Sequence, residues 1–342
     1  MKRTWKVLPA VVMPLFAFVP VSAQTQPPNA DAEATAEHAR DVQLKAIDDL
    51  LWYQKLGDIA RIDKHRIASS KPRRVTNPTA PDAGDPLVLP VYTFVPKAIA
   101  AGVKAPCLVF VHGGVHANFD THYAHIVREF LDDGYVVVAP EYRGSTGYGG
   151  HFHDQIDYGG TEVDDVHDAR NWAVGELPEV DPRRVGIVGW SHGGHIGLLN
   201  VFRFQDDYQV IYAGVPVSDL VARMGYKSAS YRDEFARFIG KQAKDDVQAY
   251  LDRSPFYHAA KLKCPLLIHS TTNDEDVNVL EVHRLIDALK AAGKTFESRI
   301  YERAPGGHAF NRIDTRLARE SRAEMRAFLA KHLKAPRGKD QP

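Results

Sequence analysis

Short apolar runs alternate with stretches of helical spacing along the greater part of the chain. The apolar runs are typical of buried strands and lie at 88–94, 107–111, 135–139, 185–189, 213–217, 265–268 and 298–301. Between them, apolar residues recur every three or four positions at about 122–132, 162–174, 192–204 and 279–292. Buried strands that alternate with helices predict an α/β fold, with a mostly parallel central sheet flanked by helices.

A different pattern precedes the first of these strands. Residues 24–36 are polar and rich in Ala and Pro, which is typical of a flexible leader. Apolar residues at helical spacing from Ala36 to Ser69 predict one or two helices that pack on the main domain. Residues 71–90 have the composition of a loop and leave room for a short strand near Val75.

The first 23 residues have the order of a secretory signal peptide. Three basic residues precede an apolar stretch from Val7 to Val19, and Val21, Ser22 and Ala23 are small enough for cleavage. The stretch is too short, and too interrupted by Pro, to span a membrane. We therefore expect secretion, to a bacterial periplasm or beyond, without membrane insertion. The alternative is an apolar N-terminus of a cytosolic protein.

The chain then divides into four parts: a signal peptide over 1–23, a leader with a helical extension over 24–71, an α/β domain over 72–335 and a polar tail over 336–342. Within the domain, residues 218–263 are helical in pattern and rich in aromatic side chains. This segment either forms a small helical cap over the site or only packs beside it.

Composition excludes several classes of protein. The chain has 342 residues, 44% of them hydrophobic and 25% charged, which is ordinary for a globular protein. Its 43 basic and 43 acidic residues balance, so no overall charge attracts it to nucleic acid. The two cysteines, Cys107 and Cys264, each start an apolar run, and we expect buried free thiols.

The motif G-x-S-x-G occurs at residues 189–193, between a predicted strand and a predicted helix. A chain that turns sharply from strand to helix places the middle residue in a strained conformation, and side chains at the flanking positions would clash. Gly189 and Gly193 meet this requirement. The turn lifts the Ser191 hydroxyl above the sheet at the positive end of the helix, so Ser191 is the predicted nucleophile.

A serine hydroxyl needs a base to take its proton, and the base needs a carboxylate to hold its tautomer. His308 lies in the glycine-rich loop 305–310 after the last predicted strand, where an imidazole reaches over Ser191. Asp274 is the predicted acid because Val277, three residues on, would anchor the loop beneath it, and Asp276 is the alternative. The order Ser, Asp, His along the chain is that of an α/β-hydrolase.

Negative charge on a tetrahedral intermediate requires two N–H donors. We expect one from the backbone of His192 and the other from residues 112–115, at Gly114 or Val115.

Four further residues are candidates for the substrate pocket: His112, Tyr142, Arg143 and Trp190. Arg143 pairs with a substrate carboxylate or, as the alternative, holds its own loop through backbone carbonyls.

These segments together resemble the catalytic domain of the prolyl oligopeptidase family of serine peptidases, especially its dipeptidyl- and acylaminoacyl-peptidase branches. The resemblance runs from Val88 to Leu333, and residues 141–149 (EYRGSTGYG) are its most family-specific part. The other similar segments are 112–116 (HGGVH), 189–194 (GWSHGG), 254–255 (SP), 265–269 (PLLIH), 274–277 and 307–310. The resemblance implies the α/β-hydrolase fold, the Ser191–Asp274–His308 triad and peptidase activity.

The sequence departs from the family in three respects. Val115 replaces the usual Pro, and residues 270–273 (STTN) replace a shorter loop that begins with Gly. The chain also lacks the N-terminal β-propeller that restricts substrates in these peptidases. The resemblance therefore implies the fold and the triad more directly than it implies the substrate.

Three classes of function follow from these observations. The first is a secreted serine hydrolase that forms an acyl-enzyme, either a peptidase for short peptides and aminoacyl amides or a carboxylesterase for small or aryl esters. The second is a catalytically inactive hydrolase fold that only binds. The third is metal-dependent hydrolysis, but the candidate metal ligands do not form a known metal-binding motif. These candidates are His112, His116, His122, His125, His151, His153 and Asp154. We expect no cofactor and no metal.

Overall fold

The computed structural model describes residues 30–75 and 77–333. The predicted signal peptide, the first part of the leader and the polar tail lie outside these residues. No helix of the described segments is long and apolar enough to cross a lipid bilayer.

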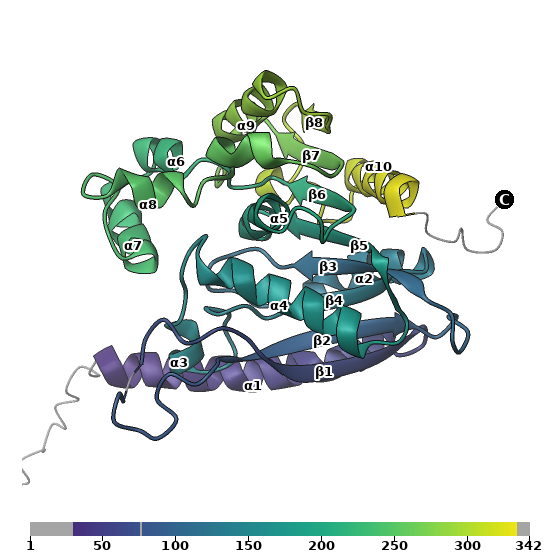
Figure 1. Cartoon of the computed structure of the whole chain (residues 1–342), viewed down its shortest axis with the longest axis horizontal. Helices are drawn as coiled ribbons and strands as arrows, with labels where there is room; N and C mark the ends of the chain where they lie inside the picture. Colours follow the sequence, from purple (N-terminus) through teal and green to yellow (C-terminus); the bar gives the residue numbers. More distant parts are fainter. Residues whose placement is uncertain (1–29, 76, 334–342) are drawn as a thin grey trace, which may run out of the picture.

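Eight strands form one twisted sheet in the order β1-β2-β4-β3-β5-β6-β7-β8 (Figure 1). β1 pairs with β2, and β2 with β4, in antiparallel orientation, whereas the pairs from β4 to β8 are parallel. The predicted mostly parallel sheet is thus confirmed. The strands are β1 (Ala60–Ala68), β2 (Val88–Pro96), β3 (Ala105–Val111), β4 (Val136–Pro140), β5 (Val180–Trp190), β6 (Val210–Gly214), β7 (Leu266–Thr271) and β8 (Glu297–Tyr301).

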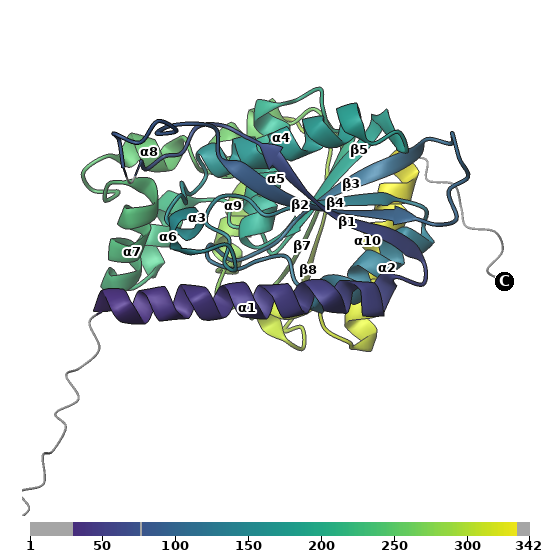
Figure 2. The same cartoon turned by 90° about the horizontal axis from the view of Figure 1, so that it is seen from below.

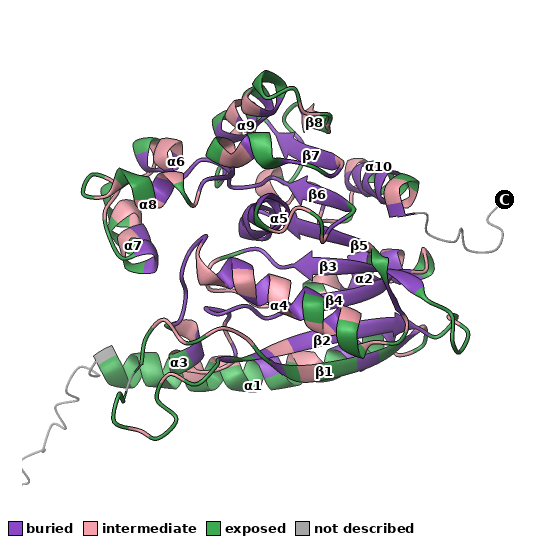
Figure 3. Ribbon diagram, viewed as in Figure 1, coloured by how far each residue is buried: buried purple, intermediate pink, exposed green. Residues whose placement is uncertain are grey.

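Helices cover both faces of the sheet (Figure 2). One face packs on α4 (Thr161–Glu176), α5 (His192–Arg203) and α9 (Val279–Ala291), and the other on α1 (Ala30–Leu56), α2 (Ala124–Asp132) and α10 (Arg316–Leu333). The central strands are therefore buried on both sides, which explains their continuous apolar runs (Figure 3). Shorter elements are α3 (Gly150–His153), α6 (Leu220–Tyr226), α7 (Ala229–Ile239), α8 (Val247–Leu251), η1 (Thr121–Tyr123), η2 (Pro255–Lys261) and η3 (Gly307–Ala309).

The N-terminal extension differs from its prediction. Helix α1 begins at Ala30, so the flexible leader predicted over 24–36 is wrong for its last residues, and the helical pattern expected up to Ser69 ends at Leu56. The next segment is the edge strand β1, which pairs along its whole length with β2. Ala60 and Ile62 pack into the core on the α1 side of the sheet, and Ile67 packs into the core on the other side, while exposed charged residues lie between them. The short strand considered near Val75 does not form in the described residues of that loop.

The sequence left two possibilities for the segment between β6 and β7, a helical cap or a segment that only packs beside the site. The structure shows the helical cap. Helices α6, α7 and α8 gather at the carboxyl edge of the sheet (Figure 1). Their apolar residues make a cluster of their own, separate from the two main cores, with Leu220, Phe235, Phe238 and Tyr250 among its members. β6 itself lies at 210–214, a few residues before the predicted 213–217.

Both cysteines are buried free thiols, as predicted. Cys107 is on β3 and Cys264 directly precedes β7, so β5 and β6 lie between them. Burial raises the pKa of each thiol to about 12, so neither is a reactive nucleophile.

Candidate active site

Ser191 stands at the turn from β5 into α5. Its backbone has φ 57° and ψ −120°, a strained conformation for a residue with a side chain, and its N–H donates to the carbonyl of Gly214 at 2.9 Å. A Cβ at Gly189 would lie 2.4 Å from the backbone of Gly193, and one at Gly193 would lie 2.2 Å from the carbonyl oxygen of Val111. Both glycines are therefore required by the turn, as the motif predicts.

His308 and Asp274 meet above the carboxyl ends of β7 and β8. The Nδ1 atom of His308 lies 2.8 Å from Oδ2 of Asp274, whose side chain has no solvent exposure. The other oxygen, Oδ1, accepts the backbone N–H groups of Asp276 and Val277, so the loop fixes the carboxylate. Because an ionised carboxylate only accepts, Nδ1 carries the proton and Nε2 has the free lone pair that a general base requires.

Asp276, the alternative acid, occupies a different position. Its carboxylate is half exposed and lies 3.6 Å from Nε2 of His308, not from Nδ1. It also pairs with Arg223 and Lys227, each at 3.2 Å. Burial acts to raise the pKa of Asp276, but the positive charges of Arg223, His308 and Lys227 outweigh it and leave the pKa lowered. The geometry of a hydrogen-bonded acid behind the histidine is therefore found at Asp274.

The two predicted sources of oxyanion donors line one cavity together with Ser191. Gly114 and Val115 come from the loop after β3, and His192 begins α5. Gly114 has φ +77°, and a Cβ there would lie 2.7 Å from the Cβ of Ala117. Gly114 is thus required by the turn of the loop itself, whereas the loop comes close to the nucleophile at Gly113, where a Cβ would lie 3.5 Å from the Cβ of Ser191.

The side chain of His192 is held from two sides. Its Nε2 atom lies 2.7 Å from Oε1 of the buried Glu162, and its ring stacks on that of Tyr158 with 4.2 Å between the centroids. Sequence reasoning did not identify Glu162 or Tyr158. Both precede or begin α4, and no motif marks them.

A cavity of about 230 Å³ opens next to Ser191. Its walls come from the loop after β3, the start of α5 and the cap, and α7 contributes Tyr231, Glu234, Phe235 and Phe238. These four residues have the i, i+3, i+4, i+7 spacing of one helix face, which is the sequence signal that could have found them. His116 also lines the cavity, and burial lowers its pKa to about 4, so it is neutral at pH 7.

The four residues predicted for the pocket do not line this cavity. Tyr142 and Trp190 are fully buried, and they donate hydrogen bonds to the carbonyl of Gly114 and to Oδ1 of Asn311. His112 is also buried, where its Nε2 lies 3.2 Å from Oε2 of Glu141. These side chains are part of the core beneath the site, and Tyr142 holds the loop that contains Gly114. Their prediction as pocket residues is wrong.

Arg143 is likewise buried, and its charge is satisfied within the protein. Its Nε and Nη2 atoms each donate to Asp165 at 2.7 Å, and Nη2 also donates to the Ser70 hydroxyl at 2.6 Å. The Arg143 side chain also donates to the carbonyl of Lys71, which lies in another loop, so Arg143 fixes its loop to α4 and to residues 70–71 rather than through carbonyls of the loop itself, as the alternative supposed. It is therefore not available to a substrate carboxylate.

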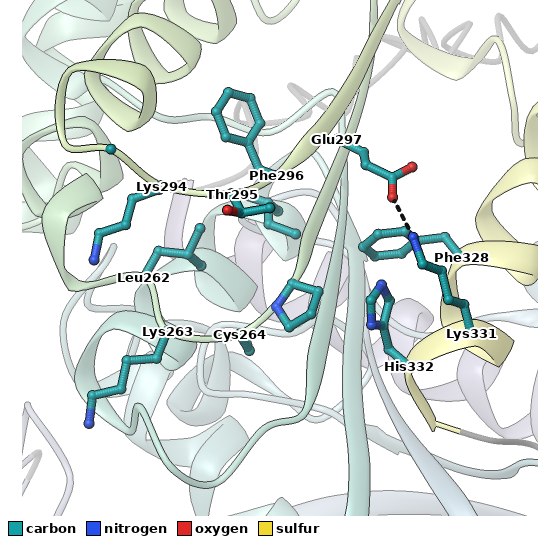
Figure 4. A pocket seen from close by; sticks show the side chains of 13 residues that line it. Leu262, Lys263, Cys264, Lys294, Thr295, Phe296, Glu297, Phe328, Lys331 and His332 are labelled. Carbon is teal, nitrogen blue, oxygen red and sulfur yellow. Dashed lines mark hydrogen bonds and ion pairs between the residues drawn. The ribbon is translucent and has the colours of Figure 1, made fainter.

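A second cavity has a volume of about 290 Å³, and Figure 4 shows the side chains that line it. It is lined by residues near the amino ends of β7 and β8, including Cys264 and Phe296, and by the last turns of α10, with Phe328 and His332. Sites in parallel sheets form at the carboxyl ends of the strands, where Ser191, Asp274 and His308 lie. In the described segments, no group of three or more His, Cys, Asp or Glu side chains is arranged to hold a metal ion.

This sheet, with its strained serine turn and the loops that follow β7 and β8, defines an α/β-hydrolase. Residues 121–336 match the model of the prolyl oligopeptidase family, and the chain belongs to that family. The predicted resemblance is thus confirmed.

The proteins similar in sequence to this chain include two bacterial peptidases. The chain is 31% identical over 230 residues to an uncharacterized peptidase, YuxL, of Bacillus subtilis, covering 64% of this chain and 34% of that protein. It is 28% identical over 249 residues to dipeptidyl aminopeptidase BIII of Pseudoxanthomonas mexicana, covering 70% of this chain and 35% of that protein. The chain therefore spans about a third of the length of these relatives.

Solved structures share the fold. A puromycin-hydrolyzing peptidase of Mycobacterium tuberculosis superimposes with a TM-score of 0.67 at 25% identity, over 81% of this chain and 40% of that one. The acylaminoacyl peptidase of Pyrococcus horikoshii gives a TM-score of 0.68 at 21% identity, over 85% of this chain and 44% of that one, which is a likeness of fold alone.

Proposed function

We propose that this protein is a serine peptidase that cleaves short peptides or aminoacyl amides through an acyl-enzyme. The observation that carries the proposal is the hydrogen bond of 2.8 Å between His308 and Asp274, in the loops that follow the strands on one side of the strained Ser191 turn. Membership of a family of serine peptidases supports amide bonds as the substrate.

The reaction that we propose has two halves. Nε2 of His308 takes the proton of the Ser191 hydroxyl as its oxygen attacks the scissile carbonyl, and Asp274 stabilises the imidazolium that results. The backbone N–H of His192 and one from Gly114 or Val115 hold the negative oxygen of the tetrahedral intermediate. His308 then protonates the leaving amine, and water releases the acyl group by the same steps.

The size of the cavity supports a small group on the acyl side of the scissile bond. Its volume of about 230 Å³ lies below the range of roughly 300–1,000 Å³ that is usual for drug-sized ligands. It therefore accommodates one side chain next to Ser191 rather than an extended peptide segment.

The test is a comparison of rates on the purified protein, with Ser191→Ala as the control. The substrates are aminoacyl and dipeptidyl p-nitroanilides together with short- and long-chain p-nitrophenyl esters. Hydrolysis of anilides at rates comparable to those of the esters, lost in Ser191→Ala, supports the peptidase. Hydrolysis of esters alone makes the protein a carboxylesterase, and activity that survives Ser191→Ala overturns the catalytic assignment. An inactive wild-type protein supports a hydrolase fold that only binds.

We also propose that the protein is exported. The support is the order of basic, apolar and small residues over the first 23 positions. N-terminal sequencing of the protein from a periplasmic or culture-medium fraction is expected to start at Gln24. Full-length protein retained in the cytoplasm would contradict export.

A further inference from the structure

Glu234 is the one acidic residue of the cavity wall that has no partner within the described part of the chain. It lies on α7, its side chain is exposed at the cavity that contains Ser191, and no hydrogen bond or ion pair involves its carboxylate. Its neighbour Asp233 accepts a hydrogen bond from Gln242, so the absence of a partner is particular to Glu234. An acidic group at the rim of a substrate cavity is therefore open to a ligand.

The positive group of the cavity wall, by contrast, is already neutralised. Arg223 is nearly buried and lies 3.0 Å from Glu281 and 3.2 Å from Asp276. Its remaining donors reach the hydroxyl groups of Tyr231 and Tyr226 at 2.7 and 3.0 Å. The charge and the N–H donors of Arg223 are therefore already paired within the protein, and Arg223 is not available to a substrate carboxylate.

The other titratable groups that face the cavity leave the negative charge of Glu234 uncompensated. Asp276 pairs with Arg223 and with Lys227, and Nε2 of His192 is already in contact with Oε1 of the buried Glu162. His116 is neutral at pH 7 because burial lowers its pKa to about 4. A cation that enters the cavity thus meets an unpaired carboxylate, whereas an anion meets repulsion.

Aromatic rings line the same cavity as Glu234. Tyr158, Tyr231, Phe235 and Phe238 line the same cavity, and three of them share the face of α7 with Glu234. Ring faces attract cations and also cover the methylene groups of a basic side chain. A carboxylate at the end of an aromatic cavity is the chemistry of a site for an alkylammonium or guanidinium group.

We propose that Glu234 selects substrates that carry a cationic group next to the scissile carbonyl. Two sources supply this chemistry: the free α-amine of an aminoacyl substrate, and the side chain of Lys or Arg. The inference rests on the proposed serine hydrolase function and names its substrate class. Glu234 acts on binding of the cation and takes no part in the proton transfers at Ser191.

The test compares matched substrates on the wild type and on Glu234→Gln. Alanine p-nitroanilide and its N-acetyl form differ only in the α-amine, and N-acetyl-lysine and N-acetyl-norleucine p-nitroanilides differ only in the side-chain charge. The substitution is expected to lower kcat/KM by about fivefold for one cationic substrate and to leave its neutral counterpart within about 1.5-fold, because a pair at the rim is partly screened. The substrate that responds identifies the source of the cation.

Asp233→Asn is the matched control, since it removes the same charge one residue away on α7. It is expected to leave all four rates unchanged. Equal losses for charged and neutral substrates, or no loss in Glu234→Gln, would overturn the proposal.

The corresponding p-nitrophenyl esters keep the inference separate from the proposed function. If no anilide is hydrolysed, the peptidase proposal fails, and free and N-acetylated aminoacyl esters still measure the selectivity of Glu234. A loss of this selectivity at 0.5 M salt would agree with an exposed ion pair.

Discussion

The Nε2 atom of His192 lies 2.7 Å from Oε1 of Glu162, and both side chains are buried. Glu162 also accepts the backbone N–H of Gly159 at 2.7 Å through the same oxygen. This contact connects the start of α4 to the residue that follows Ser191. It therefore holds the backbone N–H that our proposal assigns to the oxyanion.

Glu162→Gln is expected to hold the backbone N–H of His192 less firmly and to lower the stability of the fold. We expect kcat to fall by roughly tenfold with little change in KM, because the oxyanion donor acts chiefly in the transition state. The free energy of unfolding in urea should fall by about 1–3 kcal/mol, the usual cost of a disrupted buried hydrogen bond. Glu176→Gln, on the exposed end of the same helix, is the control and should change neither quantity. An unchanged kcat in Glu162→Gln would show that the pair serves the fold alone.

Asp274 and Asp276 make a matched pair of substitutions. Asp274→Asn is expected to lower kcat by on the order of 10³–10⁴-fold, because an amide no longer holds the Nδ1–H tautomer or stabilises the imidazolium. Asp276→Asn should change kcat by less than about tenfold, since its carboxylate faces Nε2 at 3.6 Å and pairs with Arg223. Steady-state kinetics on one ester settle the order of the two effects. The reverse order would make Asp276 the acid.

The parallel core of the fold is predictable from the sequence because burial on both faces leaves little choice of residue. Strands β3 and β4 are apolar throughout, β7 begins with three apolar residues, and the structure buries every position in all three strands. Edge elements lack this constraint. Residues 60–68 (ARIDKHRIA) place Ile62 and Ile67 among charges, a pattern that also fits a helix that continues from α1, and only pairing with β2 decides in favour of a strand.

In the candidate site, too, some residues are predictable from local sequence and others only from tertiary contacts. Ser191, Asp274 and His308 are marked by the turns that they require, so their loops can be identified from local sequence. The pocket is made by tertiary contact between the cap and the sheet, which no local pattern specifies. Tyr142 and Arg143 belong to the family-specific segment 141–149 and yet are buried, whereas Glu234, over 40 residues from Ser191 along the chain, reaches the cavity from α7.

Trp52 is expected to anchor helix α1 to the core and so to contribute to the free energy of unfolding. It is fully buried, stacks on Phe119 with 5.3 Å between ring centroids and meets Phe94 edge-on at 4.9 Å. Trp52→Ala should lower the free energy of unfolding by about 3–5 kcal/mol, as for other large side chains removed from a core. Leu50→Ala, on the same helix but 70% exposed, should change it by less than about 0.5 kcal/mol. Equal effects in urea unfolding would contradict a structural role for Trp52.

His269 is expected to make the fold sensitive to mild acid. It is fully buried on β7, and desolvation lowers its pKa to about 4, with Glu324 acting to raise it and Arg299 to lower it further. The Nδ1 atom contacts the hydroxyl groups of Ser321 and Tyr212 at 2.9 and 3.3 Å, and Glu324 lies 3.6 Å from Nε2. The folded protein therefore keeps this ring neutral at a pH where an unfolded histidine, with a pKa of about 6.5, already binds a proton.

The direction of the effect follows from proton linkage. The unfolded chain binds more protons between pH 6.5 and about 4, so the contribution of His269 is fully present above pH 6.5 and is lost as the pH falls toward 4. From pH 7 to pH 5 this loss amounts to roughly 2 kcal/mol. In urea unfolding at both pH values, His269→Gln should lose less stability on acidification than the wild type, by about that amount. His122→Gln, at a side chain that is 92% exposed, should behave as the wild type does. An unchanged pH dependence in His269→Gln would show that the folded state protonates this histidine as readily as the unfolded chain.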